Sequence, residues 1–367
     1  MLIKNFSEVV TGTTPSTKND NYYSANEYMF ITPEDLKNNR YIKSTKRYIS
    51  EYAHKDYHKR FIPKDSIVID CIGSDMGNVA ITFYEALTNQ QINAITNINL
   101  QIVKPLYLYY LLSTYKKYLH TIGSNGSTMP IISKTLFENI DINIKHNLVE
   151  QQHIVDIIGS LDDKIENNNK IIKKMNNLLN VKTNELLLYK TKKIQLNDII
   201  EECKEKAEIE LVPYSVINTG KVIIQNEQFN KEIAKNTKGK YKKIKKDYFV
   251  YNPSRINIGS IGVMEDKIGC VSPIYVVFKC NEEYKIYLQK LLTFDSMIKE
   301  INKRCSGSVR QALSFNDLCS IEIYDIEKEK LKIYNKYCDS IIRITKKLEQ
   351  ENKLLENQKK LYLAKFF

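Results

Sequence analysis

Two long stretches of the chain carry apolar residues at spacings that alternate between four and three, the pattern of a coiled-coil seam. In residues 150–188 the apolar seam positions are Ile154, Ile158, Leu161, Ile165, Ile172, Met175, Leu179 and Leu186, and Asn168 and Lys182 occupy the two remaining places. No proline interrupts this stretch, so roughly 35 residues could form one helix about 50 Å long. A helix with so narrow an apolar stripe needs a partner in water.

The same spacing returns near the end of the chain. The positions there are Leu331, Tyr334, Cys338, Ile341, Thr345, Leu348, Asn352, Leu355, Lys359 and Tyr362. Two separate bundle helices are the alternative, but the length, the narrow stripe and the charged outer faces favour a two-helix rod. Asn168 and Asn352 at seam positions would fix its register if they are buried together, or face solvent if the interface frays.

The segments that precede the two helices repeat one another. Five residues of the first half match five of the second at a constant offset of 181, namely Gly126, Ser127, Ser133, Ile140 and Ile142 with Gly307, Ser308, Ser314, Ile321 and Ile323. Farther upstream, Pro63 and residues 72–74 match Pro253 and residues 261–263, and residues 6–10 resemble residues 196–200. The chain therefore divides into a first globular domain (residues 1–147), a helix (residues 148–190), a second globular domain (residues 191–326) and a second helix (residues 327–367).

Within each globular domain the pattern is mixed. Residues 66–72 and 78–83 alternate like paired strands across a Gly-Ser-Asp-Met-Gly turn, and residues 256–258 and 274–278 predict a similar pair later. Residues 105–118 and 284–301 read as helices. The predicted class is α/β (α+β), with two similar globular domains and two long helices.

The composition agrees with this division into domains and indicates the cellular compartment. A length of 367 residues with 43% hydrophobic content suits two domains with real cores. Seven cysteines form no C-x-x-C pair, which argues against a zinc site and a disulfide framework. No segment has the length or flanks of a leader peptide or a membrane span, so we expect a cytoplasmic protein.

A net charge of +12 points to a polyanionic partner, and its distribution is more informative. One basic cluster comprises Lys43, Lys46, Arg47, Lys55, Lys59 and Arg60, and a second comprises Lys235, Lys238, Lys240, Lys242, Lys243, Lys245 and Lys246. Tyrosines are interleaved with both. Each cluster could be a solvated loop, but two at matching places in the chain favour contacts with phosphate groups.

Several motifs carry a family resemblance. Residues 11–17 (TGTTPST), 31–36 (ITPEDL), 126–128 (GST) and 148–165 (LVEQQHIVDIIGSLDDKI) resemble the specificity subunit of a type I restriction-modification enzyme. Residues 251–261 (YNPSRINIGSI) and 271–278 (VSPIYVVF) resemble a recurrent target-recognition domain of that family. Together the motifs cover nearly the whole chain.

The resemblance implies a division of labour. Each globular domain would read one half of a bipartite, asymmetric sequence in double-stranded DNA. The two helices, packed antiparallel, would set the spacing and dock two modification subunits, which bind S-adenosylmethionine and methylate adenine. Motor-nuclease subunits that use ATP and Mg would complete an ATP-dependent deoxyribonuclease. The chain itself would hold no cofactor or metal and perform no chemistry.

The residues agree with a non-catalytic role. The closest approach to an N-P-P-Y methyltransferase motif is Asn252-Pro-Ser-Arg255, no Walker loop is present, and Asp35-Leu-Lys37 lacks the upstream Pro-Asp of a nuclease site. Two alternatives stay open. One is a degenerate fused methyltransferase-nuclease, and the other is a structural or regulatory DNA-binding coiled-coil protein.

Base reading favours Arg, Lys, Asn and Gln on loops, and phosphate contacts favour exposed cations. The candidate DNA-binding residues are Thr14, Ser16, Thr17, Lys18, Asn19, Lys43, Lys46, Arg47, Lys55, Lys59, Arg60, Ser74, Asp75, Asn125, Ser127, Thr128, Lys240, Lys242, Lys243, Lys245, Lys246, Asn252, Arg255, Asn257, Arg310 and Gln311. The Ser and Asn residues beside glycines could instead cap turns, and Arg255 could pair with a carboxylate in the core.

Overall fold

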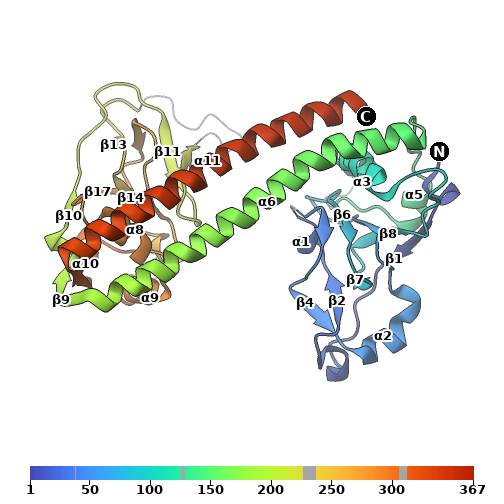
Figure 1. Cartoon of the computed structure of the whole chain (residues 1–367), viewed down its shortest axis with the longest axis horizontal. Coiled ribbons are helices and arrows are strands. Elements are labelled where there is room, and N and C mark those ends of the chain that lie inside the picture. The colour runs from blue at the N-terminus through green and yellow to red at the C-terminus, as the bar shows by residue number, and fades with distance from the viewer. Residues whose placement is uncertain (38, 125–128, 226–236, 306–311) are drawn as a thin grey trace. The chain divides into compact units, whose positions relative to one another are not determined.

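The computed structural model describes residues 1–37, 39–124, 129–225, 237–305 and 312–367 (Figure 1). Contacts divide it into two units, each of which holds a segment of both long helices. The first unit comprises Met1–Asn168 with Gln350–Phe367, and the second comprises Asn169–Glu349. Within the described residues, no helix combines the length and the apolar character needed to cross a membrane.

A five-stranded sheet forms the centre of the first unit. Its strands, in spatial order, are β1 (Glu8–Thr11), β8 (Ile92–Thr96), β5 (Ile67–Asp70), β6 (Val79–Thr82) and β3 (Tyr41–Ile42). The antiparallel β5–β6 pair confirms the hairpin predicted from residues 66–83. Alternate residues of β5 enter different cores, with Ile67 and Ile69 on one face and Val68 on the other. Both faces of the sheet are therefore covered, which explains why β5 is apolar along most of its length.

A smaller sheet completes the strands of the first unit, in the order β4 (Arg47–Ile49), β2 (Tyr28–Ile31) and β7 (Ala86–Thr88). The short elements that accompany the two sheets are η1 (Ile3–Asn5), η2 (Asp20–Tyr23), α1 (Pro33–Leu36), α2 (Glu51–Tyr57) and η3 (His58–Arg60). In Figure 1, α2 and strands β2 and β4 extend from the side of the five-stranded sheet that faces away from the long helices of this unit.

The helix predicted over residues 105–118 is two helices, α3 (Pro105–Ser113) and α4 (Lys116–Gly123). The helix predicted over residues 284–301 is likewise split into α8 (Lys285–Leu291) and α9 (Asp295–Arg304). A threonine stands in each break, and the hydroxyls of Thr114 and Thr293 donate to the carbonyls of Leu111 and Lys290, both at 2.7 Å. Such local hydrogen bonds compete with continued helix.

The described residues of the second unit form two four-stranded sheets and a strand pair. The first sheet has the order β10 (Ile200–Glu202), β17 (Val276–Cys280), β14 (Phe249–Tyr251) and β15 (Ile261–Val263). The second has the order β12 (Val222–Ile224), β11 (Pro213–Val216), β16 (Ile268–Val271) and β13 (Lys242–Lys245). Strand β9 (Lys190–Gln195) pairs with β18 (Glu322–Ile326), and the remaining short elements are η4 (Leu187–Tyr189), η5 (Leu196–Asp198) and η6 (Ile256–Ile258).

The strand predicted at residues 256–258 is wrong, because these residues form the 3-10 turn η6 and the paired strand is β14. Gly259 ends the turn with a φ of +89°, in the left-handed region that favours glycine. A Cβ at this position would lie 2.6 Å from the carbonyl oxygen of Asn218. The close approach of two backbone segments therefore decides this local conformation.

The internal repeat appears in the topology. The order β1-β8-β5-β6 of the first unit matches β10-β17-β14-β15 of the second. Ser133 and Ser314 cap equivalent helices, α5 (Lys134–Glu138) and α10 (Phe315–Cys319), by accepting hydrogen bonds from backbone N–H groups three residues later.

The N-terminal match of the repeat has a different register from the predicted one. The N–H of Ile3 donates to the carbonyl of Ile140, and that of Leu196 donates to the carbonyl of Ile321. Ile3 therefore corresponds to Leu196, whereas the sequence comparison placed Phe6 there. Short apolar segments align equally well at neighbouring offsets, and only the pairing distinguishes them.

Both predicted long helices are present as α6 (Leu148–Leu186) and α11 (Lys328–Phe366). In the first unit, Asp162 and Asn168 of α6 bond to Lys359 and Asn352 of α11, so the two segments run antiparallel. In the second unit, the hydroxyls of Thr183 and Tyr334 are 2.8 Å apart. Each unit thus has its own α6–α11 contact.

Candidate nucleic-acid interface

The first basic cluster is spread over a strand, a helix and a turn, so the alternative of a single solvated loop is wrong. Arg47 opens β4, Lys55 lies on α2, and Lys59 lies in η3. All three are exposed, and none forms an ion pair with a carboxylate among the residues that the structure describes. These side chains are therefore available to an external anion.

The other cations of this cluster have partners within the protein. Lys46 forms an ion pair with Glu34 at 2.8 Å, and the Lys43 ammonium stands 5.0 Å from the ring centroid of Phe83. The Arg60 guanidinium donates to the carbonyl of Thr11 at 3.4 Å. Because all three cations are exposed, these contacts are weak enough to be exchanged for phosphate.

The loop after β1 includes five candidate residues with different roles. Thr14 donates to Gln90 at 2.5 Å, Ser16 accepts from the N–H of Lys18, and Asn19 caps η2. Ser16 and Asn19 therefore have the turn-capping role considered as their alternative. Thr17 and Lys18 are exposed on the same loop.

Asp75 belongs to a pair of salt bridges on the β5–β6 turn, beside exposed Ser74. Its carboxylate lies 2.9 Å from the Lys37 ammonium and 2.7 Å from that of Lys116. Hydrogen bonds from Lys116 and Lys37 lower the pKa of Asp75 to about 2. The two lysines compensate a negative charge that would otherwise repel a phosphate.

This carboxyl should titrate with a midpoint of about 2, below its ordinary 3.8. A lowered folded-state pKa means that the ion pairs are complete above about pH 4 and are lost as the pH falls toward 2. In a carboxyl-detected NMR titration, Lys116→Gln should move the midpoint back toward 3.8, whereas Lys193→Gln, which alters an ion pair with Glu322 in the second unit, should leave it unchanged. A wild-type midpoint of about 4 would contradict the assignment.

The second basic cluster includes strand β13, so the alternative of a solvated loop does not hold here either. The half-buried Lys242 donates to the carbonyl of Tyr275 at 2.7 Å, and burial lowers its pKa. Lys243 and Lys245 both pair with Glu205, at 2.5 and 3.0 Å. Three of the five candidate lysines are thus bound to groups of the protein itself.

Lys240 and Lys246 remain exposed and have no carboxylate partner within the described ranges. The two basic clusters also differ in their strand environments. Strand β13 pairs with β16, a strand that follows it in the chain. Arg47 lies on β4, which pairs with β2, a strand that precedes it in the chain. Matching places along the chain therefore did not become matching places in the sheets.

Arg255 lies on the rim of a small hollow in the second unit. The hollow has a volume of about 240 Å³, and its lining includes Asn218 and Ser260. Arg255 is exposed and forms no ion pair in the portion of the chain that the structure describes, so the alternative of a core ion pair is wrong. Asn252 accepts from the N–H of Ser254 as a turn cap, and Asn257 is half-buried. Arg255 is therefore a charged side chain of this turn that is available to a ligand.

Five candidates cannot be placed, and neither can one lysine of the second cluster. Asn125, Ser127, Thr128, Arg310, Gln311 and Lys235 lie outside the described residues.

The predicted seam of α6 has both buried and half-buried positions. Ile154 and Ile158 belong to the core of the first unit, where Leu161 is half-buried and its neighbour Asp162 is buried. Ile165, Ile172 and Met175 are half-buried, and Leu179 is buried. The sequence pattern placed Lys182 on the seam, but its neighbour Thr183 is the buried residue, and Lys182 pairs with Glu185 at 2.5 Å.

On α11 the predicted seam positions are buried or half-buried, and most residues between them are exposed. Leu331, Tyr334, Cys338, Ile341 and Leu355 are buried, and Leu348 is half-buried. Burial raises the pKa of the Cys338 thiol. All seven cysteines of the chain are unpaired thiols.

The two seam asparagines meet in the first unit. Asn168 Nδ2 donates to Asn352 Oδ1 at 2.9 Å and to Glu351 Oε2 at 3.2 Å, and each asparagine is only 7% exposed. The alternative in which they face solvent is therefore wrong. Sequence reasoning missed the neighbouring polar contacts of Arg40, Tyr110 and Lys359, although the adjacent acids Asp162-Asp163 could have signalled them.

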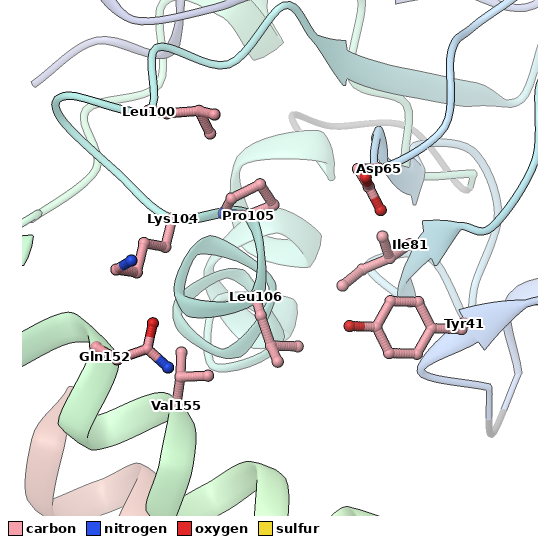
Figure 2. Close-up of a pocket in the computed structure, with 9 residues that line it drawn as sticks. All are labelled: Tyr41, Asp65, Ile81, Leu100, Lys104, Pro105, Leu106, Gln152 and Val155. Atoms are coloured by element: carbon pink, nitrogen blue, oxygen red, sulfur yellow. The ribbon is translucent and has the colours of Figure 1, made fainter.

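A larger hollow of about 420 Å³ lies on the first unit, away from the basic residues of α2 and β4. Figure 2 shows Tyr41 and Ile81 on its sheet side, Leu106 of α3 between, and Gln152 and Val155 of α6 on the other side. Its lining combines apolar side chains with the polar groups of Tyr41, Asp65, Lys104 and Gln152. The α3–α6 junction therefore leaves an open depression of mixed polarity.

Comparison with known proteins identifies the relatives of the first half. Residues 1–177 match the family model described as the type I restriction modification DNA specificity domain. The MjaIX specificity subunit of Methanocaldococcus jannaschii is 37% identical over 172 residues, which are 46% of this chain and 38% of that relative. The HindI specificity subunit of Haemophilus influenzae is 29% identical over 169 residues, 45% of this chain and 36% of that relative. The chain thus matches less than two thirds of either relative's length.

A solved structure extends the likeness to the whole chain. The type I restriction-modification S subunit from M. genitalium covers 100% of this chain and 95% of its own, with a TM-score of 0.62 and 14% sequence identity. At that identity the likeness shows a shared fold. Together with the family match, it confirms the resemblance to specificity subunits inferred from the motifs.

Proposed function

We propose, from the premise that residues 1–177 form a type I restriction modification DNA specificity domain, that this chain is the DNA-recognition subunit of such a complex. Each unit would read one half of a bipartite, asymmetric target. The observation that carries the proposal is the duplicated α/β fold, each copy of which leads into one of two paired helices. One chain with two similar reading domains suits two different half-sites.

In the first unit, the exposed cations without an ion-pair partner among the described residues support phosphate contact. Arg47, Lys55 and Lys59 lie on neighbouring elements, whereas Lys46 must exchange its ion pair with Glu34. Phosphate contacts fix the register of a protein on DNA and release counterions. Thr17 and Lys18 on the loop after β1 would lie in the same interface.

In the second unit, Arg255 is the strongest candidate for reading a base. A guanidinium forms two parallel hydrogen bonds with guanine O6 and N7 in the major groove. Its exposure and its place at a backbone turn beside a hollow support this role. Lys240 and Lys246 would contact phosphates, while Lys242, Lys243 and Lys245 hold the sheet.

The helices would act as a spacer and as a docking surface for two adenine methyltransferase subunits. Half-site separation is a geometric quantity, about 34–36 Å for each duplex turn, so a stiff helix pair suits it. S-adenosylmethionine would bind to those partner subunits, and ATP and Mg to any motor-nuclease subunits. The chain would contribute recognition and perform no chemistry.

Methylation mapping by long-read sequencing tests this function. A host that carries this chain with its methyltransferase should show methyladenine in a two-part motif with an unspecified middle, and a host with the methyltransferase alone should not. A continuous palindrome would contradict the proposal. Methyl transfer from labelled S-adenosylmethionine by the purified chain alone would exclude the non-catalytic role.

Phosphate contacts predict a salt effect for the first unit. Lys55→Ala combined with Lys59→Ala should reduce the slope of log K against log salt by about 2, since each phosphate contact contributes about 0.9. Fluorescence anisotropy with target DNA over a salt series measures the slope, and the recognised motif should stay the same. Lys193→Ala is the control, because Lys193 is tied to Glu322 at 3.0 Å. An unchanged slope would remove these lysines from the interface.

A further inference from the structure

Three segments of the first unit meet at one turn of α6. Arg40, just before β3, extends to Asp163 and Glu166 of α6, with 2.9 Å between Arg40 Nε and Glu166 Oε1. Tyr110 of α3 donates its hydroxyl to Asp162 Oδ2 at 2.8 Å. One turn of the helix therefore contacts both the sheet edge and α3.

The same turn also contacts α11. Lys359 Nζ lies 2.8 and 3.0 Å from the two carboxylate oxygens of Asp162, and 5.6 Å from the ring centroid of Tyr110. A Cβ added to Gly159 would stand 3.7 Å from the Tyr110 hydroxyl and 3.9 Å from Arg40 Nη1, so these two side chains lie together over this region of α6. We call Arg40, Tyr110, Asp162 and Lys359, with Asp163 and Glu166, the polar clamp.

Two members of the clamp are shielded from water, since the side chains of Arg40 and Asp162 are each 9% exposed, whereas Asp163 and Glu166 lie on its outer side. Burial opposes the charge of Arg40, but the hydrogen bond to Asp163 raises the pKa of the guanidinium above its ordinary value. Charged pairs held away from water depend strongly on geometry, because a displaced partner leaves a desolvated charge behind. A small rotation of the sheet against α6 would therefore be opposed.

The corresponding place in the second unit has different chemistry. Counted from the first residue of each helix, Asp162 corresponds to Ile342, Lys359 to Leu179, and Tyr110 to Lys290. Leu179 lies in the apolar core of that unit, and Ile342 packs against it. Apolar contacts are non-directional and tolerate sliding better than a set of hydrogen-bonded ions. The two recognition domains are thus attached to their helices in different ways.

We propose that the polar clamp fixes the angle of the first recognition domain on the helix pair, and that this angle restricts the enzyme to one gap length between the half-sites. The inference rests on the proposed function. One base pair corresponds to about 3.4 Å along the duplex. A domain that can tilt about its attachment would reach a half-site displaced by this distance, whereas a clamped domain would not. Arg40 is therefore a positioning residue, remote from the bases.

The test uses the complete complex of this chain with its methyltransferase subunits. Duplexes carry both half-sites with the natural gap, with one base pair fewer and with one more, and initial rates of methyl transfer are compared. Arg40→Gln should lower the preference for the natural gap by about tenfold, the factor that corresponds to 1.4 kcal/mol. The bases preferred within each half-site should not change. Arg40→Lys, which keeps one charge for Glu166, should recover some of the gap preference.

A second variant covers the case in which Arg40→Gln does not fold. Asp163→Asn combined with Glu166→Gln alters the other side of the ion pairs, at side chains that are 71% and 37% exposed, and should relax the gap preference in the same direction. Lys193→Gln, in an exposed pair of the second unit, is the matched control and should behave as wild type.

The outcomes separate the two proposals. If the folded Arg40→Gln or Asp163→Asn/Glu166→Gln complex keeps the wild-type gap preference, the clamp does not set the spacing and the inference fails while the proposed function stands. If the wild-type complex methylates no two-part target, the proposed function itself fails.

Discussion

Replacing Arg255 with alanine should leave one base position of the second half-site unread. The Arg255 side chain is exposed beside the hollow of the second unit and has no carboxylate partner among the described residues. A bidentate arginine–guanine contact contributes about 1–3 kcal/mol of discrimination against the wrong base. Long-read methylation mapping of the Arg255→Ala complex should therefore return the same bipartite motif with one degenerate position.

Two further variants show whether Arg255 reads a base or contributes only charge. Arg255→Lys keeps the charge but loses the planar fork, so the motif should still lose that position while the salt slope stays close to wild type. Lys240→Ala, in the same unit, should weaken binding to all sequences equally. If Arg255→Ala also weakens all sequences equally, Arg255 contacts a phosphate and the assignment is wrong.

Asn168→Leu should lower the melting temperature of the first unit. The substitution removes the amide that donates to Asn352 and Glu351, so the buried Asn352 loses this hydrogen bond. Removing one partner of a buried hydrogen bond costs about 1–3 kcal/mol. In a domain of this size each kcal/mol corresponds to about 2–4 °C. Circular dichroism melts of the variant and the wild type measure the shift.

The double variant Asn168→Leu/Asn352→Leu provides the decisive comparison. Two facing leucines leave no polar group of this pair unsatisfied, so the double variant should be at least as stable as the wild type, with a coupling energy of about 0.5–3 kcal/mol. Asn167→Leu, at an exposed position of the same helix, is the control and should change stability by less than about 0.5 kcal/mol. A double variant less stable than both single variants would contradict a paired role for the two asparagines.

The helices and the repeat were the most predictable features of the fold. An apolar spacing of three and four over many residues predicts a helix whatever the tertiary structure around it. Helices α6 and α11 begin and end close to the predicted limits. The β5–β6 hairpin was predictable because two short apolar runs on either side of a glycine-marked turn are local features, although the strands are buried on both faces and do not alternate. The breaks at Thr114 and Thr293 were missed because one hydroxyl can end a helix without disturbing its apolar pattern.

The sequence predicted which residue types would form the candidate interface, but not which of those side chains are free of ion pairs within the protein. Lys55 and Lys243 look alike in the sequence, yet one is exposed and unpaired within the described residues and the other is bound to Glu205. The difference depends on a carboxylate from a distant loop, Glu205, which no spacing rule locates. The adjacent acids on α6 indicated that a cation was needed, but not that it would be Arg40, because Arg40 is more than a hundred residues away from Asp163 and Glu166.

The amino-acid sequence by itself determined the two long helices, the duplicated architecture, the positive charge and the family resemblance, because each of these depends on residue type and on spacing along the chain. Tertiary structure alone decided which seam polar groups meet, which lysines are already paired and how Arg40 joins the sheet to the helices. Those outcomes depend on the relative placement of distant segments, where a shift of one residue changes every partner.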